Sequence, residues 1–171
     1  MRTLIMLLTV IGTTASLGVE VLAAEVPAEG KIDSTFTRIT TTTAMPSADG
    51  NEAKSFDAML VLTGNAKGSL LDHMVGHCML AGLNNPGTGA VKLAGWCTYT
   101  DLDGDMIFAS DEESAPSSTS VAQGTAKITG GTGKYAGITG EYSFTDEYVG
   151  SPKEGVYGGM GTKSGGYKIV K

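Results

Sequence analysis

The stretch MVGHCMLAGLNNPGTGAVKLAGWC, residues 74–97, contains both cysteines of the chain and decides the fold class. A turn sequence rich in Asn, Pro and Gly separates two runs of strand-forming residues. If the turn is centred between Gly87 and Thr88, Cys78 and Cys97 face each other on adjacent antiparallel strands. Cysteines so placed can form a disulfide, which would stabilise the chain by about 3 kcal/mol. The stretch therefore predicts a disulfide-linked β-hairpin.

A pair of free thiols or a metal site is the alternative for these cysteines. His73 and His77 lie close by in the sequence, but residues four apart on a strand are separated by about 13 Å. Only Cys97 could join His77 and Cys78 from a distant part of the chain. We therefore expect a disulfide and no bound metal.

The dipeptide Asp103-Gly104 predicts the next hairpin, with a two-residue turn that pairs Tyr99 with Phe108. Together the two hairpins sort the side chains of three strands onto two faces, unless a bulge exchanges them. The more apolar face, expected to point inward, holds Met74, Cys78, Leu80, Leu93, Cys97, Tyr99, Met106 and Phe108. The other face holds Val75, His77, Met79, Trp96, Thr98, Thr100 and Ile107.

The rest of the chain after residue 30 has the same character, with short β-rich runs between turn signals and no sustained helical periodicity. The acidic, Ser-rich segment Asp111–Ser120 is predicted to be a loop. Glycines in the last run suggest bends or bulges. The eight predicted strands are Ile32–Thr43, Ser55–Thr63, Met74–Leu83, Val91–Thr100, Asp105–Ser110, Val121–Thr129, Thr139–Tyr148 and Val156–Val170.

Eight strands in one domain predict an all-β fold, an eight-stranded antiparallel barrel of the up-and-down type. A β-sandwich is the alternative. The chain has 171 residues, enough for one domain with a substantial core.

The N-terminus has the features of a secretory signal peptide. Met1-Arg2 gives a positive start, Leu4–Ile11 is apolar, and small residues end at Ala24. The apolar run is too short to span a bilayer as a helix, and no later segment is long enough. We expect residues 1–24 to be removed and residues 25–171 to form a single exported domain, periplasmic or secreted, with no membrane insertion.

The charge balance argues against nucleic-acid binding. The chain carries 12 Lys and Arg against 18 Asp and Glu, for a net charge of −6. Proteins that bind nucleic acid need a basic patch to neutralise phosphates.

Two motifs suggest ligands but fail on closer inspection. The segment Asp101–Asp105 resembles a calcium loop, yet Met106 stands where that loop needs glycine, so an Asp-rich turn is expected. The segment Gly130–Tyr135 resembles a phosphate-binding loop, but Ile128 replaces a required glycine. Its glycines are expected to make a tight connection between strands, with Lys134 exposed.

A resemblance to a known superfamily agrees with the strand count. The segment GTAKITGGTGKYAGITGEYSF, residues 124–144, resembles the glycine-rich segment of dirigent-like and allene-oxide-cyclase-like proteins. The segments 95–108 and His77-Cys78 look like those of exported bacterial members. The resemblance covers roughly residues 56–144 and implies an eight-stranded antiparallel barrel. It does not carry over catalytic residues.

Three functions fit such a barrel. The first is binding of a small hydrophobic molecule in the lumen, with no cofactor. The second is an enzyme, a cyclase or isomerase acting on a lipid-like or polyketide-like substrate by confinement and orientation. The third is a filled barrel that serves structure or homo-oligomerisation. No motif dictates a reaction. The empty volume of the lumen is the measurement that distinguishes the three functions. For the first, the expected lining is Phe56, Leu60, Leu80, Tyr99, Phe108, Tyr142 and Phe144.

Overall fold

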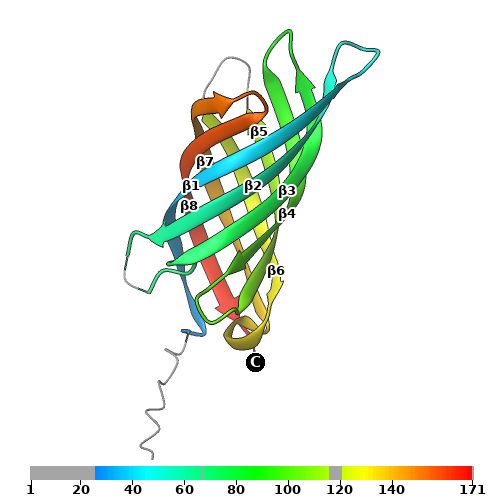
Figure 1. Cartoon of the computed structure of the whole chain (residues 1–171). Coiled ribbons are helices and arrows are strands. Elements are labelled where there is room, and N and C mark those ends of the chain that lie inside the picture. Colours follow the sequence, from blue (N-terminus) through cyan, green and yellow to red (C-terminus); the bar gives the residue numbers. More distant parts are fainter. Residues whose placement is uncertain (1–25, 67, 116–120, 171) are drawn as a thin grey trace, which may run out of the picture.

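The computed structural model describes residues 26–66, 68–115 and 121–170. The predicted signal peptide lies outside the described residues. The described residues form one closed barrel of eight strands with a short 3₁₀ turn, η1 (Gly133–Tyr135) (Figure 1). The strands are β1 (Glu29–Pro46), β2 (Glu52–Gly64), β3 (Met74–Asn85), β4 (Ala90–Thr100), β5 (Met106–Ala115), β6 (Val121–Gly131), β7 (Ile138–Lys153) and β8 (Val156–Ile169).

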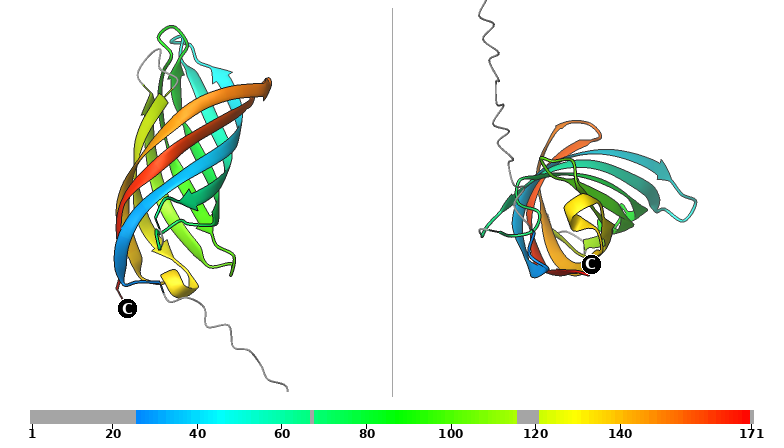
Figure 2. Two further views of the ribbon diagram at one scale, coloured as in Figure 1. Left: turned by 90° about the vertical axis from the view of Figure 1, so that its left-hand side faces the viewer. Right: turned by 90° about the horizontal axis from the view of Figure 1, so that it is seen from below.

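Each strand pairs antiparallel with the next, and β1 pairs with β8 to close the ring. The all-β prediction and all eight strands are confirmed, and the alternative β-sandwich is wrong. In Figures 1 and 2, the strands tilt strongly around the barrel axis. Closure leaves no unpaired sheet edge. No described helix is long and apolar enough to cross a membrane.

The register of β3 and β4 is the predicted one. Cys78 pairs with Cys97, and the two form a disulfide inside the barrel. Both are buried. Met74, Leu80 and Leu93 also point inward, as predicted.

The register of β4 and β5 differs from the predicted one by one residue. Tyr99 pairs with Ile107, because the turn is wider than two residues and the Asp101 amide donates to the Asp105 carbonyl at 3.1 Å. Ile107 is therefore fully buried, whereas Phe108 and Met106 are only half-buried. The prediction that Phe108 and Met106 point inward and Ile107 outward is wrong.

The acidic segment after residue 110 is also corrected. Strand β5 continues to Ala115, so Asp111 and Glu113 lie on a strand and not in a loop. They continue the inward alternation of Ile107 and Ala109. The remainder of the predicted loop, residues 116–120, lies outside the described residues.

The lumen has two different halves. The lower half is the one whose end η1 covers in Figure 1, as the view from below in Figure 2 shows. Apolar side chains fill this half. Its buried side chains are Ile32, Leu62, Leu70, Leu71, Met74, Tyr99, Ile107, Ile128, Tyr135, Ile138, Tyr167 and Ile169. The upper half, toward the β1–β2 and β3–β4 hairpins, contains charged side chains.

Glycines on the inner wall make room for the largest side chains of neighbouring strands. Gly124 pairs with Phe144, and a Cβ at Gly124 would lie 2.1 Å from the Phe144 ring. Gly161 pairs with Phe36, whose ring would be 2.5 Å from an added Cβ. An inner methyl group at either position has no free volume. At Gly161, a glycine of β8 thus makes room for a lumen side chain. The register shifts of the β7–β8 pair lie between Tyr148 and Lys153 of β7.

The buried disulfide leads to a prediction about redox state. Oxidised protein should show no reactive thiol before or after denaturation, measured with a thiol reagent. The double variant Cys78→Ala/Cys97→Ala should keep the barrel but lose about 3 kcal/mol of unfolding free energy, since the unfolded chain gains freedom. Two thiols in the denatured, oxidised protein would contradict this.

The packing of Gly124 against Phe144 leads to a second prediction. Gly124→Ala should lower the unfolding free energy by about 2 kcal/mol, because the added methyl overlaps the ring and the Glu112 carbonyl. Gly150→Ala is the matched control, since nothing lies within 4 Å of a Cβ there. Urea unfolding of both variants measures the difference, and equal stabilities would refute the packing account.

Candidate functional site

Five charged side chains from four strands meet in the upper half of the lumen. They are Arg38 on β1, Asp111 and Glu113 on β5, Asp146 on β7 and Lys163 on β8. Burying charges is costly unless they are paired, so such groups concentrate where a site requires them. This polar cluster is the candidate functional site.

Lys163 is the most deeply buried cation, with a side chain only 2% exposed. Its Nζ lies 3.9 Å from Asp111 Oδ2 and within 5.4 Å of the centroids of four aromatic rings. Burial lowers the pKa of Lys163, while Asp111, Asp146 and Glu113 oppose that shift. The rings favour the charged ammonium. They belong to Phe36, Tyr99, Tyr142 and Phe144.

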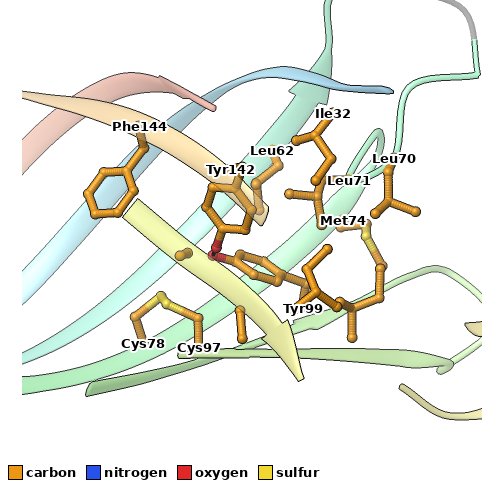
Figure 3. Close-up of a cluster of buried hydrophobic side chains, with 14 of the residues drawn as sticks. Ile32, Leu62, Leu70, Leu71, Met74, Cys78, Cys97, Tyr99, Tyr142 and Phe144 are labelled. Carbon is orange, nitrogen blue, oxygen red and sulfur yellow. Dashed lines mark hydrogen bonds between the residues drawn. A yellow bond between two sulfur atoms is a disulfide. The ribbon is translucent and has the colours of Figure 1, made fainter. Parts of the chain in front are cut away.

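Two tyrosines connect the cluster to the apolar half. Tyr142 Oη donates to Asp111 Oδ1 at 3.2 Å, and the hydroxyls of Tyr99 and Tyr142 are 2.8 Å apart. Figure 3 shows these two hydroxyls meeting between the rings. Since the Tyr142 proton goes to Asp111, Tyr99 donates to Tyr142. Burial raises the pKa of both tyrosines, so both stay protonated.

Arg38 and Asp146 form the second ion pair. Arg38 Nε donates to Asp146 Oδ2 at 2.6 Å, and Nη1 donates to Thr40 Oγ1 at 2.5 Å. Burial raises the pKa of Asp146, and Arg38 counteracts this. The second carboxylate oxygen, Asp146 Oδ1, is buried and has no hydrogen-bond partner in the described chain. Asp146 Oδ1 is therefore free to accept a hydrogen bond from a ligand.

Glu113 is the carboxylate without a direct partner. Burial and the nearby Asp146 raise its pKa to about 7, against the attraction of Arg38 and Lys163. None of the hydrogen bonds between described residues involves its side chain. The cluster thus holds two cations and three carboxylates, and Glu113 titrates near neutral pH.

A cavity of about 50 Å³ lies beside the polar cluster and is partly open to solvent. A buried water needs roughly 10–15 Å³ by this measure, so the space would hold a few waters. Apolar side chains form the rest of its wall, among them Phe56, Leu60, Leu80, Leu93 and Phe144.

The predicted lining residues divide into three groups. Phe56, Leu60, Leu80 and Phe144 line the cavity. Tyr99 and Tyr142 are buried beside it and connect to it through Asp111. Phe108 lies on the side of β5 opposite to the buried Ile107 and Ala109, so it is not a lining residue.

Sequence analysis did not identify the five charged residues. Asp111 and Glu113 fall in the segment predicted to be a loop, although their spacing of two continues the strand alternation. Lys163 stands among glycines, and neither Arg38 nor Asp146 belongs to a motif. The sequence signal for these residues is their spacing: each stands an even number of positions from inward-facing residues of its own strand.

The Asp-rich turn is held by η1. Asp101 accepts hydrogen bonds from two backbone amides of its own turn and from the Tyr135 hydroxyl. Lys134 Nζ lies 2.7 Å from Asp101 Oδ2 and also contacts Asp103. Lys134 is therefore not a freely exposed lysine, and the prediction of its exposure is wrong. Positive φ angles at Gly133 (+50°) and Gly137 (+80°) confirm the predicted turn role of this segment.

The two histidines lie outside the lumen. His77 Nε2 is 2.8 Å from Asp57 Oδ1 on the outer wall, and His73 pairs with Asp72. Among described residues, the ligand-type side chains close enough to share an ion are Cys78, Cys97 and Asp111. Two of these are bonded to each other in the disulfide, so they do not offer free thiolates.

The outer wall of β1–β4 exposes a row of large apolar side chains. They alternate with the buried residues, as predicted for Val75, Met79 and Trp96. The exposed members on these strands include Ile39, Met59, Val61, Val75, Met79 and Trp96.

The raised pKa of Glu113 leads to a prediction about stability and pH. The native state binds the Glu113 proton more tightly than the unfolded state, whose pKa is near 4.5. Stability should therefore fall as pH rises from about 4.5 to 7 and level off above. Glu113→Gln should remove this loss, on the order of 1–3 kcal/mol at pH 8.

Urea unfolding at pH 4.5, 6 and 8 measures the effect. Asp111 and Asp146 also have raised pKa values and leave a residual slope of the same sign in the variant. Glu112→Gln on the exposed side of β5 is the matched control. Parallel pH profiles for wild type and Glu113→Gln would refute the assignment.

Comparison with known proteins gives a weak likeness. No family model matches the sequence, and no curated protein matches it. Among solved structures, a pterocarpan synthase dirigent protein is similar with a TM-score of 0.49 and 11% sequence identity. The match covers 85% of this chain and 89% of that chain. The barrel fold of this chain rests on its own strand pairing.

Proposed function

We propose that this chain binds a small molecule in the upper half of its lumen. The cavity beside the polar cluster carries the proposal, because apolar walls and buried charged groups face the same space. Binding sites for small molecules combine these two features. The ligand would place an apolar body against Phe56, Leu80 and Leu93 and a polar end near Glu113.

The charged groups argue against a lumen that serves stability alone. Replacing buried ion pairs with apolar residues is often neutral or stabilising, so a purely structural core has no need of them. The lower half of the lumen has such an apolar core. The filled-barrel hypothesis therefore explains that half and leaves the upper half unexplained.

The size of the cavity limits the ligand. A volume of about 50 Å³ is far below the several hundred Å³ that would enclose a drug-sized molecule. Only a small group would be buried beside the cluster. A longer ligand would extend past the half-buried Phe56 toward the hairpins.

A second candidate function is proton-transfer catalysis. A carboxylic acid whose pKa is about 7 can accept and donate a proton at neutral pH. With Glu113 as the acid–base group, the upper lumen would suit an isomerisation or cyclisation of a small bound substrate. This candidate requires the same binding site.

The buried disulfide supports the proposal that the protein works in an oxidising compartment, either the periplasm or the extracellular space. The apolar run and small residues before position 25 support export.

A cavity-filling variant tests lumen binding. Ala58 is buried and lines the cavity, so Ala58→Leu should fill it and abolish binding. Met59→Leu changes the neighbouring exposed residue and should retain binding. Ligands are found by native mass spectrometry of protein purified from its own host and by ligand-observed NMR with a panel of small amphiphiles.

The wild type should bind at least one compound, with an increase in melting temperature. A second filling variant, Leu93→Phe, covers the case in which Ala58→Leu fails to fold. Binding that survives in a folded filling variant, or a wild type that binds nothing, would refute the proposal.

A further inference from the structure

We propose that the polar end of the ligand is a cation, and that the upper lumen takes a small primary ammonium group on an apolar stem. This inference rests on the lumen binding proposed above. Its evidence is the carboxylate oxygens that accept no hydrogen bond within the described chain and the balance of charges around the cavity.

Two carboxylates at the cavity have oxygens that accept no hydrogen bond from the described part of the chain. The Glu113 carboxylate accepts no hydrogen bond from a described residue, and Asp146 Oδ1 is a buried acceptor with no partner. The two nearby cations each lie beside another carboxylate: Arg38 donates to Asp146 Oδ2 and to Thr40, and Lys163, which donates no hydrogen bond to a described residue, lies 3.9 Å from Asp111 and against aromatic rings. Buried acceptors of this kind are satisfied by a ligand that donates. An ammonium has three donors and no acceptor.

The charges favour the same ligand. With Glu113 ionised, the three carboxylates exceed Arg38 and Lys163 by one negative charge. A monovalent cation at the cavity restores neutrality inside the low-dielectric lumen. An anionic ligand would meet Asp146 and Glu113 at close range, and the Arg38 guanidinium is already bonded to a carboxylate at 2.6 Å.

The lumen already holds one alkylammonium group in this manner. Lys163 Nζ sits 4.7 Å from the ring centroids of Tyr142 and Phe144 and 3.9 Å from Asp111. A ligand ammonium near Glu113 would find the same combination, because Phe144 and Phe56 also line the cavity. Its stem would pack against Leu80 and Leu93.

Binding of a cation should be coupled to proton release. A positive charge beside Glu113 favours its ionised form, against the burial and the Asp146 charge that raise its pKa to about 7. Arg38, Lys163 and Asp111 are the other charged groups that act on it. Below pH 7 the ligand therefore displaces a proton, and its affinity should rise as the pH approaches 7.5.

Calorimetric titrations with three matched probes test the inference. n-Butylamine, n-butanol and sodium butyrate share an apolar stem and differ in charge. The amine should bind wild type about tenfold more tightly than the alcohol, and butyrate should bind more weakly still. Titrations at pH 6 in two buffers of different ionisation enthalpy should show release of most of one proton with the amine only.

Glu113→Gln and Glu112→Gln are the matched variants. Glu113→Gln should weaken amine binding about tenfold and abolish proton release. It should leave butanol binding intact, and this binding also shows that the lumen of the variant is folded. Glu112→Gln should behave like wild type, since Glu112 is exposed on the other side of β5.

The outcomes separate the two proposals. If none of the three probes binds wild type in these titrations, the result counts against both. If butanol or butyrate binds as tightly as the amine, lumen binding stands and the cation inference is wrong. Unchanged amine affinity in Glu113→Gln would also overturn it.

Discussion

The pairing of β1 with β8 is the constraint on which the rest of the structure depends. Once the sheet closes, every second residue of each strand must fit into one shared lumen of fixed width. Large inner side chains then require small partners on the neighbouring strand, as Phe144 requires Gly124 and Phe36 requires Gly161. The many glycines of this chain are in part a consequence of closure.

Closure also decides the chemistry of the lumen. Charged side chains at inner positions have little contact with bulk water, so most of them pair with one another across the barrel. Arg38 reaches Asp146 and Lys163 approaches Asp111, in both cases from different strands. The third carboxylate, Glu113, has no cation of its own, and its proton affinity rises instead. The carboxylate of Glu113 is therefore the group of the polar cluster that a ligand would contact.

Local sequence patterns predicted the strands well but not the site. The β3–β4 register followed from the symmetric positions of Cys78 and Cys97 about one turn. The β4–β5 register did not, because Asp101 holds a wider turn with help from Tyr135, over thirty residues away. The sequence does not predict the charged cluster for a similar reason. Asp111 is tolerated inside the barrel only because distant strands bring Lys163 and Tyr142 close to it. Such pairings depend on the closed ring and leave no trace in short windows of sequence.

The position of Trp96 has a practical consequence. It is the single tryptophan of the chain, is 61% exposed, and sits opposite Met79 on the outer wall. Its emission therefore reports mainly the polarity outside the barrel. A blue shift of that emission would signal that something has covered the apolar outer face. The chain thus carries a natural optical probe of its exterior.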